Sequence, residues 1–134
     1  MSQRYMLDTN VVSHIMQGRD TELLSRLTTL SVGQVVMSSV TLAELEYGLH
    51  RKGQPVRLKR ALAELLRRMD VLSWDEDIAT CYGEFCATLE AQGINLSDFD
   101  MMIAAHAVAA DVTLVSRDKA FSQVPEQRLR LEIW

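Results

Sequence analysis

Residues 35–45 read VVMSSVTLAEL. The apolar run at 35–37 favours a short buried strand, and the residues from 42 onward begin a helical pattern. Residues 38–41 form the connection between the two elements. A buried strand that leads into a helix is the first half of a β-α-β unit, in which the strands run parallel. The segment therefore predicts a parallel sheet covered by helices.

The same alternation of strand and helix continues on both sides of this segment. Short apolar runs that favour strands occur at residues 5–7, 71–72, 112–115 and 129–133. Helical patterns lie between them, and the clearest is an apolar stripe with i, i+3, i+4, i+7 spacing at Leu58, Ala61, Leu62, Leu65, Leu66 and Met69. This alternation predicts an α/β fold in which helices flank both faces of a central parallel sheet.

The composition indicates an ordinary globular protein. The 134 residues, 48% of them hydrophobic and 24% charged, fit one domain over residues 1–134. No apolar run approaches the roughly 20 residues of a membrane helix, and the apolar stretch before Asp8 is too short for a secretory signal. We therefore expect a cytoplasmic protein without membrane association, in which Cys81 and Cys86 stay reduced. The formal net charge of -4 argues against nucleic-acid binding by the whole surface but permits a local basic patch.

Acidic residues follow three of the predicted strands. Asp8 comes directly after the first strand, Glu44 lies shortly after the second, and Asp118 follows the fourth. Ligands of a parallel sheet collect beyond the carboxyl ends of its strands, so we expect these carboxylates at one edge. Asp100 is a fourth acid that this rule does not place.

Helix capping is the structural alternative for each acid. Residues 41–44 and 97–100 both resemble capping boxes, and Asp8 and Asp118 suit turns or N-caps. Four converging carboxylates would, however, repel one another unless a cation lay between them. Convergence in the fold would therefore favour a metal site.

Oxygen ligands point to a hard cation, Mg²⁺ or Mn²⁺. The chain has no His and Cys cluster at zinc spacing, no Gly-rich phosphate loop and no G-x-S-x-G nucleophile motif. Metal-assisted phosphoester hydrolysis is the chemistry that remains, with Asn10 and Ser116 as candidates for orienting phosphate or water. The rival is another α/β phosphohydrolase or phospho-acceptor class, but its D-x-D motif would require an acid where Asn10 stands.

Four motifs occur in order along the chain. They are MLDTN at 6–10, SSVTLAEL at 38–45 with Gly48, DMMIAAHA at 100–107, and TLVSRD at 113–118 with Phe121, and the chain ends in Trp134. In this order and spacing the chain resembles PIN-domain ribonucleases, specifically the VapC-type toxins of bacterial VapBC toxin–antitoxin modules. The resemblance covers the sequence from end to end.

This resemblance implies a PIN-like three-layer α/β/α fold with an acidic pocket that binds Mg²⁺ or Mn²⁺. Asp8 and Asp100 would be the direct ligands, Asp100 being chosen over Asp98, and Glu44 and Asp118 would complete the catalytic pocket. The implied activity is endoribonucleolytic, with tRNA as the expected substrate and a cognate VapB-type antitoxin as inhibitor. A non-catalytic PIN-like module that binds RNA or protein is the alternative, against which the four acids argue.

Two surfaces are predicted to meet partners. A basic track that could guide an RNA backbone comprises Arg57, Lys59, Arg60, Arg67 and Arg68, although a solvated helix face is its alternative. The two helices after the first two strands carry more apolar residues than a small sheet consumes, namely Val11, Val12, Ile15, Met16, Leu42, Leu45, Tyr47 and Leu49. We expect a homodimer that binds a short partner helix.

Overall fold

Strands and helices alternate along the chain, and the strands form a single sheet. The computed structural model describes residues 3–134. The strands are β1 (Tyr5–Leu7), β2 (Val35–Ser38), β3 (Asp70–Leu72), β4 (Thr113–Val115) and β5 (Leu131–Glu132). The helices are α1 (Thr9–Gln17), α2 (Thr21–Thr28), α3 (Ser39–Arg51), α4 (Val56–Arg68), α5 (Glu76–Ala91), α6 (Asp98–Ala109) and the 3-10 helix η1 (Lys119–Gln123).

The sheet has the strand order β3-β2-β1-β4-β5, and every neighbouring pair is parallel. The chain begins in the centre, adds β2 and β3 on one side, and then crosses over to place β4 and β5 on the other. Leu7 pairs with Val115, so β1 and β4 end at the same level. Their onward connections lead in opposite directions, and ligands of parallel sheets generally bind beyond the carboxyl ends of strands at such a switch point.

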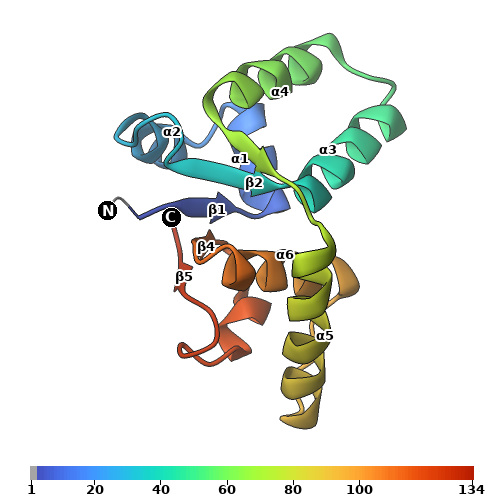
Figure 1. The fold of residues 1–134 in the computed structure, drawn as a ribbon. Coiled ribbons are helices and arrows are strands. Elements are labelled where there is room, and N and C mark those ends of the chain that lie inside the picture. The colour runs from blue at the N-terminus through green and yellow to red at the C-terminus, as the bar shows by residue number, and fades with distance from the viewer. Residues whose placement is uncertain (1–2) are drawn as a thin grey trace.

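Helices cover both faces of this sheet and make three layers, with α1 to α4 on one face and α5 and α6 on the other (Figure 1). Successive strand residues point to opposite faces. Met6 and Leu114 belong to the core beneath α5 and α6, whereas Leu7 and Val115 belong to the core beneath α1 to α4. β1 and β4 are therefore apolar on both faces, which explains their continuous apolar runs in the sequence.

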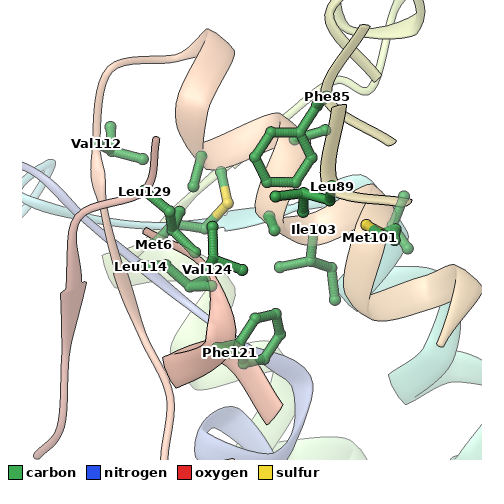
Figure 2. Close-up of a cluster of buried hydrophobic side chains, with 14 of the residues drawn as sticks. Met6, Phe85, Leu89, Met101, Ile103, Val112, Leu114, Phe121, Val124 and Leu129 are labelled. Atoms are coloured by element: carbon green, nitrogen blue, oxygen red, sulfur yellow. The ribbon is translucent and has the colours of Figure 1, made fainter. Parts of the chain in front are cut away.

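Figure 2 shows the core on the α5 and α6 side. Three side chains of this core are at most 1% exposed, namely Phe85 and Leu89 of α5 and Ile103 of α6. They pack over Met6 of the central strand. Because α6 is seated on this core, its first turn is held at the carboxyl edge of the sheet. That turn carries Asp100.

The predicted three-layer α/β fold is confirmed, and the amphipathic stripe forms α4 with Leu62 and Leu65 buried. Two local predictions are wrong. The last strand comprises Leu131–Glu132 and not 129–133, because the backbone N–H of Leu129 is bonded to Pro125 in a turn. Thr41 is not an N-cap, because α3 begins directly where β2 ends and the Ser38 hydroxyl accepts the N–H of Val40 at 3.1 Å.

The predicted surplus of apolar surface is also wrong for most of its residues. Val11, Val12, Ile15, Met16, Leu45 and Leu49 are all buried, since α1 packs against α3 and α4 as well as the sheet. Tyr47, at 64% exposure, does stay on the surface.

The cysteines agree with the prediction, because Cys81 and Cys86 on α5 are both free. Among the residues that the structure describes, no helix has the length and apolarity required to cross a membrane.

Candidate active site

Asp8 lies at the junction of β1 and α1. It is the N-cap of α1, and its Oδ1 accepts the backbone N–H of Val11 at 2.9 Å. Its Oδ2 accepts the hydroxyl of Ser116, the first residue after β4. Asp8 and Ser116 are 4% and 1% exposed. The two central strands are therefore joined at their carboxyl ends, and Asp8 is held in one orientation. Asp8 thus caps a helix and also lies where the carboxyl ends of β1 and β4 meet.

The Ser116 hydroxyl also positions a second acid. Its oxygen accepts the N–H of Asp118 at 3.0 Å, and Asp118 caps η1 by accepting the N–H of Ala120 at 2.9 Å. Ser116 was predicted to orient phosphate or water. In the structure its hydrogen bonds go to the two acids, while Asn10, the other predicted orienting residue, is exposed at the start of α1.

Asp100 reaches the site from the first turn of α6. Ser97 is the N-cap, and its hydroxyl oxygen accepts the Asp100 N–H at 3.2 Å, as the 97–100 pattern predicted. Asp98, two residues earlier, is exposed, whereas Asp100 is half-buried. The helix therefore presents these two acids differently, although their sequence surroundings are alike.

Three of the four predicted acids interact electrostatically. Burial raises the pKa of Asp8 above its ordinary value, and the carboxylates of Asp100 and Asp118 raise it further, against the opposing bonds from Ser116 and Val11. Burial likewise raises the pKa of Asp100, and Asp118 adds to that rise. Residues from β1, α6 and the loop after β4 thus form one group of like charges.

Glu44 is linked to this group through a neighbour of Asp8. Its Oε1 accepts the hydroxyl of Thr9 at 2.6 Å, which connects the middle of α3 to the first residue of α1. The Thr9 hydroxyl also lies 3.3 Å from that of Thr41. Glu44 therefore borders the acid group on its α3 side.

The donor set suits a hard divalent cation. Within residues 3–134 no three His, Cys, Asp or Glu side chains stand in ready-made ligating geometry. The raised pKa values of Asp8 and Asp100 nevertheless mean that the protein disfavours their ionised forms, a cost that a nearby cation offsets. Carboxylate oxygens are the ligands that Mg²⁺ and Mn²⁺ prefer.

A buried polar contact that the sequence did not reveal joins the helices carrying Glu44 and Asp100. His106 of α6, 1% exposed, places its Nδ1 2.8 Å from the hydroxyl oxygen of the fully buried Ser38 at the start of α3. Burial lowers the pKa of His106, with a smaller opposing effect from Asp75. In the sequence, the only sign that His106 is structurally important is its place in the DMMIAAHA motif. The motif does not indicate that its partner is Ser38.

The loop that carries Ser116 and Asp118 has an anchor of its own. Arg117 lies between them and donates from Nη1 to Asp20 at 2.6 Å and from Nε to the Trp134 carbonyl at 2.7 Å. Both partners lie far from Arg117 in sequence. The loop is therefore held by the segment before α2 and by residue 134.

The structure divides the predicted basic track. All five residues are exposed on α4, but Leu58 in its first turn lines a cavity with Glu44, whereas Arg68 lines a hollow with Val35 at the amino end of β2. Ten helical residues separate Leu58 from Arg68, about 15 Å along the axis. The first part of the track thus lies on the acid side, and the last part lies toward the opposite edge of the sheet.

The family model of the PIN domain matches residues 5–127. The chain belongs to the PIN-domain family. This PIN domain is 36% identical over 132 residues to ribonuclease VapC2 of Haemophilus influenzae, an alignment that covers 98% of each chain. It is 34% identical over 132 residues to the tRNA(fMet)-specific endonuclease VapC of Shigella flexneri, again with 98% of each chain covered.

A solved structure agrees with this assignment. The crystal structure of VapBC2 from Rickettsia felis, bound to a DNA fragment from its promoter, superposes on this PIN domain with a TM-score of 0.88 at 29% identity. The match covers 98% of this chain and 99% of that chain. The predicted resemblance to VapC ribonucleases is therefore confirmed.

Proposed function

We propose that this PIN domain is the endoribonuclease toxin of a toxin–antitoxin pair and that it hydrolyses RNA with Mg²⁺ or Mn²⁺. The observation that carries the proposal is the group formed by Asp8, Asp100 and Asp118 at the switch point between β1 and β4. Such a group of like charges is costly unless a cation uses it. Similarity along nearly the whole chain to proteins named ribonucleases supports RNA as the substrate.

In this proposal Asp8 and Asp100 would hold the cation, and Glu44 and Asp118 would complete the pocket. The chemistry that the cation would supply is a lower pKa for bound water and neutralisation of charge on the phosphate. Ser116 keeps the Asp8 carboxylate oriented, and the burial of both residues excludes bulk water from that side of the site. Direct attack by water leaves a 5′-phosphate and a 3′-hydroxyl, which distinguishes this reaction from that of a histidine-pair nuclease.

The comparisons also support the proposed partners. The Shigella relative is named for tRNA(fMet), so tRNA is the substrate class that we propose for this chain. Similar structures are VapBC complexes, which supports a cognate VapB-type antitoxin as the neutralising partner. Exposed Tyr47 on α3 and Val56 at the start of α4, at 64% and 62%, are candidate contacts for a homodimer. A cytoplasmic location remains a prediction.

Two acids on one helix allow a matched test of the proposal. Asp100→Asn should abolish cleavage of tRNA in Mg²⁺ or Mn²⁺, whereas Asp98→Asn, a change of the same kind at an exposed position two residues earlier, should leave it intact. Cleavage is followed on gels with 5′-end analysis of the products, with and without chelator. Equal activity of the two variants would contradict the site, and a wild type that binds RNA without cutting it would favour the non-catalytic module.

A further inference from the structure

A cavity of about 120 Å³ lies between α1, α3 and α4 and reaches Glu44 and Thr9, the residue that follows Asp8. Thr9 and Glu44, which are hydrogen-bonded at 2.6 Å, line the end of the cavity nearest to Asp8. From there the lining follows one face of α1 and one face of α3 as far as Lys52. Lys52 is eight residues beyond Glu44, or about 12 Å along the helix axis. The cavity therefore leads away from the predicted point of cleavage.

The chemistry of its lining is mixed. Buried Met16 and Leu45, together with Leu58 of α4, contribute apolar surface. The amides of Asn10 and Gln17 lie on the α1 side, and each amide can both donate and accept hydrogen bonds. A volume of 120 Å³ is several times the roughly 10–15 Å³ that one ordered water requires, so the cavity has room for a planar ring.

We propose that this cavity binds one unstacked nucleobase of the RNA, adjacent to the phosphate that is cut. This inference rests on the proposed function and adds to it a site that selects the substrate. Proteins that take a base out of the stack hold its face between aromatic or apolar side chains and hydrogen-bond its edge. Met16 and Leu45 supply the first kind of contact, and Asn10 and Gln17 supply the second. Lys52 at the far end is placed to meet the backbone phosphate.

Continuity with the acids favours a nucleobase over a side chain of a partner protein. Glu44 belongs both to the cavity and to the proposed catalytic pocket. A strand whose phosphate lies at the acids therefore has a neighbouring nucleotide at the mouth of the cavity. The cationic end at Lys52 also matches a polyanion.

Gly48 offers a way to fill the cavity without disturbing the fold. It lines the cavity from α3, and a Cβ atom at this position would have no other atom within 4 Å. Replacing a glycine inside a helix also favours the helix by up to about 1 kcal/mol. Gly83 on α5 is an exposed helical glycine with equally open surroundings, so Gly83→Leu is a matched control for Gly48→Leu.

The test compares cleavage of RNA strands that carry either a normal or an abasic nucleotide on one side of the cut phosphate. The wild type should cut one of the abasic strands about tenfold more slowly, because that strand loses both the apolar contacts and the hydrogen bonds of the bound base. Gly48→Leu should cut the intact strand slowly and lose most of this difference. Gly83→Leu should behave as the wild type, and circular dichroism should show both variants folded.

The outcomes separate this inference from the proposed function. A wild type that cuts no RNA overturns both. A wild type that cuts intact and abasic strands equally overturns the nucleobase site alone, and this comparison requires no variant. Gly48→Leu that keeps the full base dependence also overturns it. So does a Gly48→Leu that cuts RNA normally but no longer binds its antitoxin, because the cavity would then belong to a protein partner.

Discussion

Replacing Asp8 by asparagine distinguishes a metal site from a purely structural helix cap. Asparagine keeps an oxygen that can accept the Val11 N–H, so the cap on α1 survives. Burial is the main cause of the raised Asp8 pKa, and repulsion by Asp100 and Asp118 adds to it. The change to asparagine removes the charge on which both effects act. We therefore expect metal-free Asp8→Asn to be at least as stable as the wild type at neutral pH.

The difference in stability between Asp8→Asn and the wild type should also change with pH in a defined direction. Because the pKa of Asp8 is raised in the folded state, its ionised form lowers the stability of the wild type at pH values above that pKa. Stability is regained as the pH falls through the folded pKa toward the ordinary value. The Asp8→Asn variant lacks this gain, so its advantage over the wild type should shrink in mild acid.

A second variant separates the contribution of the helix cap to stability from that of metal binding. Asp8→Ala also removes the cap, so it should be about 1 kcal/mol less stable than Asp8→Asn, with or without metal. In a chain of this size that corresponds to about 4 °C in Tm. Mn²⁺ at a hundred times its Kd should stabilise the wild type by about 2.7 kcal/mol, and this increment should shrink in both variants.

The measurement is thermal unfolding of the wild type and both variants with and without Mn²⁺. RNA cleavage is assayed on the same proteins. Asp8→Asn should stay folded, lose most of the Mn²⁺ increment and lose cleavage. A variant that still cuts RNA at nearly the wild-type rate would refute the catalytic assignment. An Asp8→Asn that is destabilised as much as Asp8→Ala would refute the electrostatic reasoning.

Three further changes test the surroundings of the site. His106→Leu removes one of the two hydrogen-bond partners of the buried Ser38 hydroxyl and should lower the free energy of unfolding in urea by about 1–3 kcal/mol, whereas His106→Asn should restore part of that loss. Arg60→Gln should weaken RNA binding and reduce the slope of log K against log salt by about 0.7–0.9, whereas Arg68→Gln should change neither. Arg117→Ala removes the bond that lowers the pKa of Asp20; its Tm deficit should be constant near neutral pH and shrink below about pH 4, as Asp20 becomes protonated.

Local patterns in the sequence are sufficient to predict the layers of this fold. Apolar runs and helical periodicity reflect which faces of each element are buried, and that property is encoded within a few neighbouring residues. The positions of Asp8 and Asp118 just after strands follow from the same patterns. Asp100 has no such signal, because it begins a helix and does not follow a strand. Its proposed role came from the resemblance to PIN domains, and in the structure its charge contributes to the raised pKa of Asp8.

Hydrogen bonds between distant residues were decided by the tertiary structure. The Ser116 hydroxyl bonds to Asp8, 108 residues earlier, and His106 lies against Ser38, 68 residues earlier. A serine or a histidine can find a partner in many places, and packing of the core determines which one it meets. For that reason the sequence could propose Ser116 as a phosphate contact, whereas the structure shows it holding two acids.

The division of the basic residues has the same origin. The sequence shows that basic residues of α4 share the solvent side of an amphipathic helix. It does not show how that helix lies over the sheet, and this direction places Leu58 beside Glu44 and Arg68 beside the amino end of β2. The sequence by itself determined the alternation of strands and helices and the positions of three of the four acids, because these depend on neighbouring residues. The tertiary structure alone decided which acids interact, which hydroxyl orients them and where the cavity opens, because these depend on how helices pack across the sheet.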